Sequence, residues 1–366
     1  MTPGFHRLLT TALPSALPLA LLLAGSAQAQ TAAPAATSAA GNSNVTVYGL
    51  IDAATRRSTN SAGGGSAWSM EDGLITGSRF GLRMREDLGD GMAALVTIES
   101  GFDPSTGSSL QGSPTADYGQ ISAASRMWGR EVHVGLRGSL GTVTLGRQYT
   151  VAHSLAGRFQ PLGNPNSTAH SLFSSHHVAR QDNLLRVDGK LGGVDLVASY
   201  TFGEQAASSS ANSAWALGAG YTAGALSLAA YVQQLDNLAG TETRRVLGLG
   251  GNYKVGQSVT LYGGLMRRSA EVSPQTNRAW TLGANLQLQP LVTLSLAHYQ
   301  DDQDGSAALK GSRTVSWVTA NYQFSRRTDA YVLVDRNRVV GGYARPSFMA
   351  TKGTQNGLGF GLRHRF

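Results

Sequence analysis

Segments of about ten residues, in which apolar and polar side chains alternate, follow one another along almost the whole chain. An extended strand places successive side chains on opposite faces, so each segment predicts a strand with one apolar and one polar face. Sixteen such segments run from "NVTVYGLIDA" (44–53) to the terminal "NGLGFGLRHRF" (356–366). Their connections alternate between short turns, such as "GDG" at 89–91, and long loops, such as residues 150–179.

This order of turns and loops predicts an up-and-down antiparallel sheet whose tight turns all lie at one end. Tilted strands of about ten residues have the length needed to cross a bilayer. An open sheet edge in hydrocarbon would leave backbone N–H and C=O groups unpaired, which is prohibitively costly. We therefore predict an all-β fold, a 16-stranded antiparallel transmembrane β-barrel over residues 44–366, whose last strand pairs with the first. Phe366 is expected to lie in that closing seam.

The composition supports strands over helices. Charged residues make up 14% of the chain, against roughly 25% in an average soluble protein, and there are 46 glycines. The chain has no cysteine, which excludes disulfides, thiolate metal sites and cysteine catalysis. A charged n-region, the apolar run "LLTTALPSALPLALLLAG" and a small-residue "AQA" predict a cleaved signal peptide over residues 1–29. Residues 30–43 read as a low-complexity linker.

Side-chain parity assigns the charged residues of the strands to the channel interior. An arginine facing hydrocarbon costs roughly 2–4 kcal/mol near the bilayer midplane, so arginines are expected opposite the apolar face. The basic residues placed inside are Arg79, Arg83, Arg85, Arg137, Arg180, Arg186, Arg363 and Arg365. The acids placed inside are Asp52, Glu99 and Asp182. Four aromatic residues at the short-turn ends of strands predict an interfacial girdle: Tyr221, Tyr253, Phe324 and Phe366.

Several segments together resemble the general porins of Gram-negative, especially beta-proteobacterial, outer membranes. They are "VTVYGLIDA", "SRFGLRMREDLGDGMAALVTIESGF", "VGLRGSLGTVTLGRQYT", "VASYTFGE" and "GLRHRF", and the resemblance extends from residue 45 to residue 366. It implies a homotrimer, with a third extracellular loop folded into the lumen as a constriction. It also implies that Phe366 belongs to the signal read by the outer-membrane assembly machinery, and that Arg79 and Arg83 match arginines of the family's channel wall.

The third loop departs from the family pattern, in which acidic loop residues commonly oppose arginines of the wall. Residues 150–179 contain no Asp or Glu. The ionisable residues of the expected constriction are His153, Arg158, His170, His176 and His177. We interpret the histidines as members of a solvated, pH-sensitive loop, with metal binding as the less favoured alternative. An arginine-lined lumen and an acid-free loop predict a weak to moderate anion preference. The alternative is that luminal acids neutralise these arginines.

We therefore expect a passive diffusion channel for small hydrophilic solutes and ions in the outer membrane. Two alternatives remain: a solute-selective anion channel with a binding site at the third loop, and a secreted soluble β-rich adhesin or binding module. Outer-membrane lipids and lipopolysaccharide are expected as partners. Nucleic acid is not expected, because the basic pI of about 9.9 has no accompanying nucleic-acid-binding motif. No cofactor is expected, and no nucleophile signature indicates an enzyme.

Overall fold

The computed structural model describes residues 43–111, 125–206 and 208–366. The chain divides into two units, and the described residues belong to the second, Ala40–Phe366. The predicted signal peptide (1–29) and all but the last residue of the predicted linker (30–43) lie outside the described residues. No helix in the described ranges has the length and apolar character needed to cross a bilayer.

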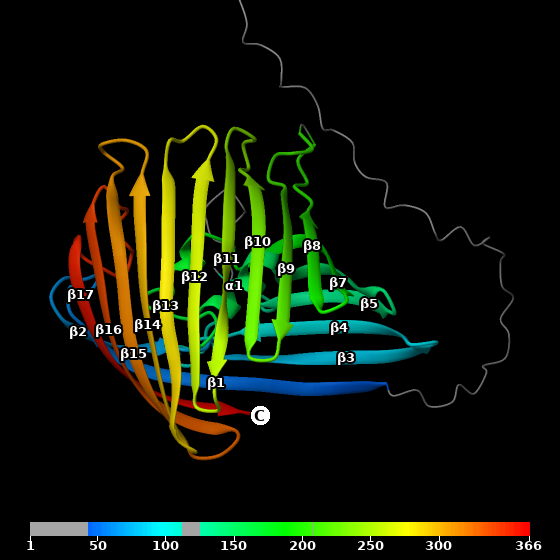
Figure 1. The fold of residues 1–366 in the computed structure, drawn as a ribbon, viewed down its shortest axis with the longest axis horizontal. Helices are drawn as coiled ribbons and strands as arrows, with labels where there is room; N and C mark the ends of the chain where they lie inside the picture. The colour runs from blue at the N-terminus through cyan, green and yellow to red at the C-terminus, as the bar shows by residue number, and fades with distance from the viewer. Residues whose placement is uncertain (1–42, 112–124, 207) are drawn as a thin grey trace, which may run out of the picture. The chain divides into compact units, whose positions relative to one another are not determined.

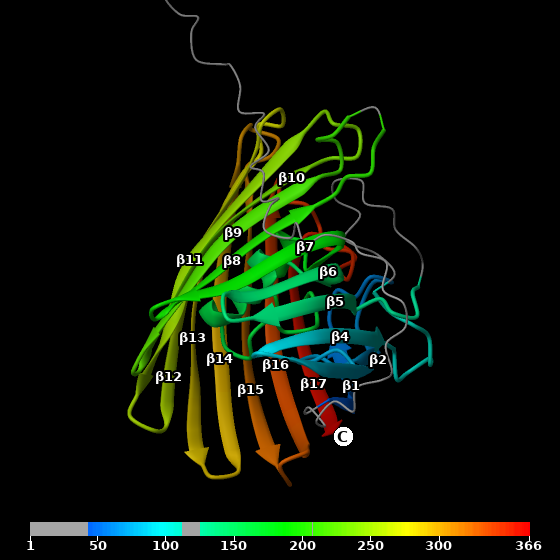
Figure 2. The same cartoon turned by 90° about the vertical axis from the view of Figure 1, so that its right-hand side faces the viewer.

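Within the described ranges, seventeen β-strands form a single antiparallel sheet (Figures 1 and 2). They are β1 (Asn44–Ser58), β2 (Ala67–Asp72), β3 (Arg79–Gly89), β4 (Met92–Gly101), β5 (Glu131–Gly138), β6 (Gly141–Tyr149), β7 (Arg180–Leu191), β8 (Val194–Thr201), β9 (Ala214–Ala223), β10 (Leu226–Asp236), β11 (Thr243–Val255), β12 (Val259–Ala270), β13 (Thr276–Gln289), β14 (Val292–Asp304), β15 (Gly311–Gln323), β16 (Thr328–Gly341) and β17 (Gly353–Arg365). Three short helical segments lie between β6 and β7: α1 (Val151–Ala156), η1 (Gly157–Phe159) and η2 (Phe173–Ser175).

The sheet closes into a barrel of sixteen strand positions. One edge of β1 pairs with β17, from Leu50↔Arg365 to Ser58↔Gly357. Its other edge pairs first with β3 and then with β2, so β2 and β3 are two parts of one strand position. Residues 73–78 interrupt that position and turn inward, where Leu74 and Ile75 are buried. The predicted 16-stranded barrel is confirmed. No alternating segment predicted β2, which lies between the first two predicted strands.

The predicted parity holds in the strands around the seam. Val45 and Val47 are 63% and 66% exposed on the outer face of β1, whereas Asp52 is fully buried on the inner face. On β17, the exposed apolar side chains are Leu358, Phe360 and Leu362. Tyr221 and Tyr253 are exposed near the short-turn ends of their strands, as the girdle requires.

The last residue of the chain completes the seam. The N–H of Gly49 donates to the carbonyl oxygen of Phe366, and the N–H of Phe366 donates to that of Gly49, both at 3.1 Å. The Phe366 ring covers Gly49 closely enough that a Cβ at this position would collide with it. Gly49 is therefore required by close approach of an aromatic ring, and Phe366 is a structural element of the barrel.

We expect Gly49→Val to weaken the seam by about 1–3 kcal/mol, because the added side chain overpacks the contact with Phe366. The measurement is the temperature at which the compact band is lost on unboiled denaturing gels. In a Phe366→Ala background the same substitution should cost much less. Equal effects in both backgrounds would contradict the proposed contact.

Candidate functional site

The connection between β6 and β7, residues 150–179, is called the inner loop here because it folds into the barrel (Figure 2). Thr150 holds its neck closed. The Thr150 hydroxyl donates to the Val178 carbonyl at 2.6 Å, and the Thr150 N–H donates to that of Ala179 at 3.0 Å. The same hydroxyl oxygen accepts the His153 N–H at 3.2 Å and caps α1. The loop therefore leaves and re-enters the wall at one point.

An apolar face fixes the inner loop against one half of the wall. Its buried contributions include Val151, Leu155, Phe159, Leu172 and Phe173. The wall residues of the same cluster come from β9 to β15 and are Ala216, Ala229, Tyr231, Val246, Met266, Ala279, Ala297, Tyr299, Val315 and Trp317. Burial of this apolar surface stabilises the inward position of the loop. The loop thus covers the inner face of β9 to β15, and leaves the wall of β3 to β5 outside this contact.

Glycines of the wall make room for this contact. A Cβ on Gly264 would lie 2.7 Å from Cβ of Phe159, and one on Gly283 would lie 2.5 Å from Cγ of Pro161. Gly218 and Gly250 are covered in the same way, by loop side chains that include Leu155 and Phe159. These glycines let the backbone of the loop approach the wall more closely than any other residue would allow.

Two buried histidines of the inner loop bind acids of the wall. Nε2 of His176 lies 2.6 Å from Oδ2 of Asp301, and Nε2 of His170 lies 3.1 Å from Oδ2 of Asp335. The expectation of a solvated loop was therefore wrong for His170, His176 and His177, all of which are buried. A buried carboxylate must be paired or hydrogen-bonded, and the loop histidines meet this need for Asp301 and Asp335. The sequence of the loop does not show these contacts, because the acids lie on distant strands.

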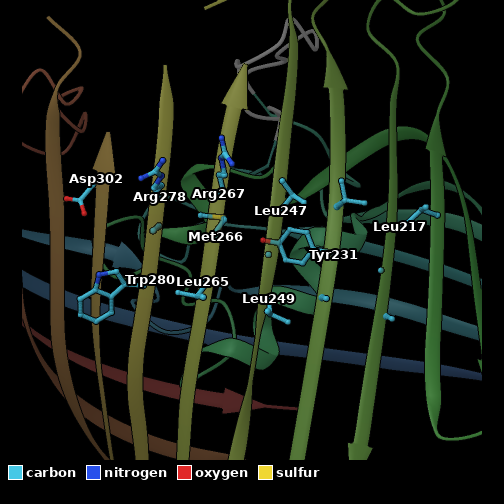
Figure 3. Close-up of a pocket in the computed structure, with 16 residues that line it drawn as sticks. Leu217, Tyr231, Leu247, Leu249, Leu265, Met266, Arg267, Arg278, Trp280 and Asp302 are labelled. Carbon is cyan, nitrogen blue, oxygen red and sulfur yellow. The ribbon is translucent and has the colours of Figure 1, made fainter. Parts of the chain in front are cut away.

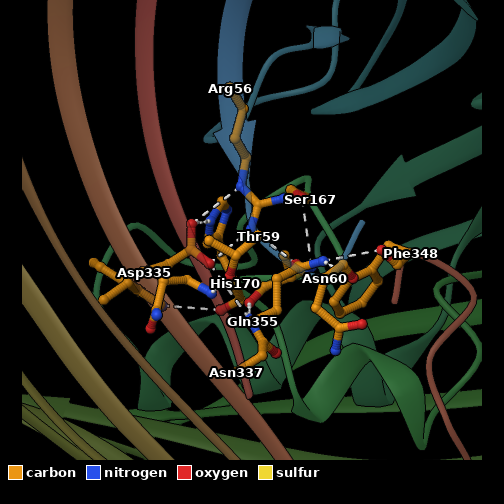
Figure 4. A network of polar contacts seen from close by, with 12 residues as sticks. Arg56, Thr59, Asn60, Ser167, His170, Asp335, Asn337, Phe348 and Gln355 are labelled. Atoms are coloured by element: carbon orange, nitrogen blue, oxygen red, sulfur yellow. Dashed lines mark hydrogen bonds and ion pairs between the residues drawn. The ribbon is translucent and has the colours of Figure 1, made fainter. Parts of the chain in front are cut away.

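A wider polar network surrounds Asp335 (Figure 4). Nη2 of Arg56 lies 2.7 Å from Oδ1 of Asp335 and also donates to Oε1 of Gln355 at 3.1 Å. Asn337 donates from Nδ2 to the Ala169 carbonyl at 2.9 Å. Residues of β1, β16 and β17 thereby hold the far side of the loop. Asp335 lies between the outward-facing Val334 and Arg336, so parity places its side chain inside the barrel. The inward position of Asp335 could therefore have been predicted from sequence.

His153 and His177 form a separate, uncharged pair. Nδ1 of His153 lies 3.2 Å from Nε2 of His177, and the His153 ring stacks on Tyr149 at 5.1 Å between centroids. Burial, with a smaller effect of the neighbouring His176, lowers the pKa of His177 to about 3. Burial and then the neighbouring His177, Arg180 and Arg130 lower the pKa of His153. Among the described residues, no group of three His, Cys, Asp or Glu side chains is arranged to hold a metal ion.

The two predicted wall acids are held by specific donors. Oε1 of Glu99 lies 2.5 Å from Nε of Arg130, its Oε2 accepts the Tyr48 hydroxyl at 2.8 Å, and Arg79 is 3.8 Å away. Asp52 accepts the Tyr331 hydroxyl at 2.8 Å. It also accepts both the N–H and the hydroxyl of Thr76 at 3.0 Å, from the inward-turned segment between β2 and β3. From sequence, we did not predict that Arg130 and Tyr331 bind these acids. Arg130 precedes β5 outside the strand pattern, and Tyr331 reaches Asp52 from a strand that is distant in the sequence.

Several predicted arginines are paired with acids. Arg186 binds both oxygens of Asp188 at 2.8 Å, and Nη2 of Arg158 lies 3.1 Å from Asp195. Arg363 and Arg365 both bind Asp329, at 3.0 and 2.8 Å. The neutralisation alternative therefore holds for this group of arginines.

The prediction that Arg180, Asp182 and Arg186 share a face was wrong. Asn183 adopts φ +53°, and the pairing of β6 with β7 shifts by one residue at this bulge. Asp182 instead pairs with Arg147 at 2.8 Å, beside outer-face residues that include the exposed Val132 and Phe202. A bulge reverses parity, and its local signs are weak: an asparagine, which tolerates a positive φ, and Gly146 within the partner strand.

On β3 and β5, three predicted arginines have no acid partner in the described part of the chain: Arg83, Arg85 and Arg137. The Arg83 guanidinium lies 3.9 Å from the centre of the Tyr48 ring, which orients it without cancelling its charge. Arg137 donates to the Thr142 hydroxyl at 3.4 Å. All three lie on β3 and β5, in the part of the wall outside the apolar contact of the inner loop.

Known proteins share this architecture. The model of a family described as Gram-negative porin matches residues 15–342. An outer membrane porin protein of Bordetella pertussis is 31% identical over 178 residues, which cover 44% of this chain and 40% of that relative. The chain thus matches well under half of the relative's length.

Solved structures show the same fold at low sequence identity. The anion-selective porin from Comamonas acidovorans superimposes with a TM-score of 0.75 at 21% identity, over 89% of this chain and all of that one. OmpT, an outer membrane protein of Vibrio cholerae, gives a TM-score of 0.66 at 15% identity, over 90% of this chain and 99% of that one. A trimer form of OmpT gives 0.62 at 16% identity, over 88% and 99%.

We expect Gly264→Val to destabilise the protein by about 1–3 kcal/mol, since the new side chain must displace Phe159. Gly263→Val is the matched control, because a Cβ there meets its nearest neighbour, Leu282, at an ordinary 3.5 Å. Loss of the compact gel band on heating compares the two. Equal destabilisation would show that the inner loop does not depend on the glycine contact.

We expect acid to loosen the inner loop through its neutral histidines. The folded-state pKa of His177 lies below its unfolded value, so the unfolded chain binds more protons. This contribution is complete above about pH 6.5 and is lost as the pH falls toward 3, by about 2 kcal/mol at pH 5. Unfolding temperature between pH 7 and 4 measures it. His177→Gln should flatten the profile, and an unchanged slope would contradict the assignment.

Proposed function

We propose that this chain, which belongs to the family of Gram-negative porins, forms a water-filled channel through which small hydrophilic solutes and ions cross the outer membrane passively. The observation that carries the proposal is the division of the barrel interior. The inner loop packs against β9 to β15 and is held at its far side by β1, β16 and β17, and the polar wall of β3 to β5 lies outside these contacts. Passage requires that solutes leave as readily as they enter, so we propose that the polar lumen holds solutes only weakly.

We further propose that the constriction favours anions. The loop carries no acid, and its histidines His170 and His176 contact Asp335 and Asp301. The carboxylate of Glu99 lies near both Arg130 and Arg79. At the inward-facing positions of β3 and β5, Arg79, Arg83, Arg85 and Arg137 outnumber Asp87 and Glu131. The net positive charge raises the local concentration of anions within a Debye length of about 8–10 Å. The anion-selective porin of Comamonas acidovorans, which shares the fold, agrees with this proposal.

The oligomeric state and the assembly route belong to the same proposal. A trimer form is known for the similarly folded OmpT of Vibrio cholerae, and we propose a homotrimer for this chain. We also propose that Phe366 forms part of the signal that the outer-membrane assembly machinery reads, because the residue ends the last strand and completes the seam.

We expect a reversal potential of the sign carried by chloride when the purified protein separates a tenfold KCl gradient in a planar bilayer. Arg83→Ala should lower the chloride-to-potassium permeability ratio about five- to tenfold, because a unit charge at about 7 Å in water attracts chloride and repels potassium by about 0.6 kcal/mol each. Arg57→Ala removes an arginine from the outer face of β1 and should leave the ratio unchanged.

A cation-selective potential would mean that the luminal acids dominate and would overturn the anion preference. Absence of any conductance, from protein whose compact gel band confirms folding, would overturn the channel itself.

A further inference from the structure

Two arginines face each other on the outside of the barrel. Arg267 on β12 is the direct cross-strand partner of Arg278 on β13. Their neighbours Met266 and Ala279 point inward into the apolar cluster with the inner loop, so both arginines point outward, and both are exposed. Figure 3 shows the two side chains next to each other at the same height of the wall.

This pair is only partly compensated within the protein. Like charges placed directly opposite each other in a sheet are destabilising. Among the described residues, neither arginine forms an ion pair or a hydrogen bond with another side chain. Asp302 on β14 is the cross-strand partner of Arg278 alone, and its carboxylate also accepts from Nε2 of Gln300 at 2.7 Å. The two arginines and this one acid together keep a net positive charge. An external anion bound between the arginines would remove the repulsion and gain two charge-assisted hydrogen bonds.

The surface beside the arginines is apolar. They border a hollow of about 830 Å³ on the barrel wall, which the exposed side chains of Leu247, Leu265 and Trp280 also line (Figure 3). In Figure 3, Trp280 and Leu265 lie on the short-turn side of the arginines. An anion bound between the arginines would therefore lie directly beside an apolar surface of the protein.

The height of the pair on the wall matches a membrane boundary. Arg278 lies eleven residues from Gln289, the end of β13 at the short turn. At about 3.4 Å per residue and a tilt of about 45°, this is about 25 Å along the membrane normal, the height of the apolar band of such barrels. Tryptophan is typical of this interface. The pair thus sits where headgroups of the loop-side leaflet begin.

We propose that Arg267 and Arg278 bind the phosphate of a phosphorylated glycolipid of the outer leaflet. The phosphate bridges the two guanidinium groups, and an acyl chain of the same molecule lies over Leu265 and Trp280. A lipid fits better than a free anion or a protein partner, because charge and apolar surface meet here at bilayer depth. The inference rests on the proposed membrane location but not on conduction.

Native mass spectrometry of the purified protein tests the site, with diphosphorylated lipid A and its dephosphorylated form as probes at equal concentration. We expect the wild type to retain the diphosphorylated form preferentially. Arg267→Gln/Arg278→Gln should bind it about tenfold more weakly, since two charge-assisted contacts are lost. Arg57→Gln/Arg338→Gln removes two other outward-facing arginines and should bind as the wild type does.

Equal retention of both lipid forms, or an equal loss in both double variants, would overturn the proposal in favour of nonspecific attraction. Single-channel conductance of each variant confirms an intact barrel and keeps failure of this site distinct from failure of the channel function.

A single variant, Arg267→Gln, provides a second readout of opposite sign, because the other cross-strand neighbour of Arg267 is the uncharged Leu247. In neutral detergent without lipid it should unfold at a higher temperature than the wild type, because the repulsion between the arginines is relieved. With diphosphorylated lipid A present, the wild type should gain more stability than the variant. The proposal would be overturned if the substitution left the unfolding temperature unchanged, or if the phosphorylated lipid stabilised the wild type and the variant equally.

Discussion

The requirement that every backbone N–H and C=O in hydrocarbon be paired within the protein determines the rest of this structure. It forces the sheet to close, and closure joins the first strand to the last, so that Gly49 and Phe366 become hydrogen-bonded neighbours. A closed ring with fixed pairing also fixes which face of each strand meets lipid and which meets water. Every later property, from the aromatic residues at the short turns to the charges of the lumen, follows from that assignment.

The inner loop illustrates how a polar interior is organised once the ring exists. A loop with no acid is held inside a barrel by acids that the wall contributes, chiefly Asp301 and Asp335. Glycines on the wall remove the side chains that would hold the loop away, and an apolar face of the loop fills the space. Anchoring and charge selection are thereby separated: buried histidines do the first, and exposed arginines on the opposite strands are proposed to do the second.

Most of the barrel was predictable from sequence, because alternation, turn length and the cost of burying charge are local signals. They located the strands, the seam and the inward position of Asp52 and Glu99. Two of the failures have a common physical origin in contacts between distant segments. The break between β2 and β3 is stabilised by Tyr331 of a remote strand, and the burial of His170 depends on Asp335. The bulge at Asn183 reversed the face of Asp182 through one backbone angle.

The glycines under the inner loop have a consequence for how such a protein changes over evolutionary time. The open cross-section of the barrel is the space that the packed inner loop leaves free. Its width therefore depends on buried residues between the loop and the wall, which do not contact solutes. Replacing Gly264 or Gly283 by larger residues would push the loop toward the arginines opposite and narrow the passage, with every water-facing side chain retained. The size limit of the passage is thus set by buried packing between the loop and the wall. Substitutions there can change the size limit without changing the charges that discriminate between ions.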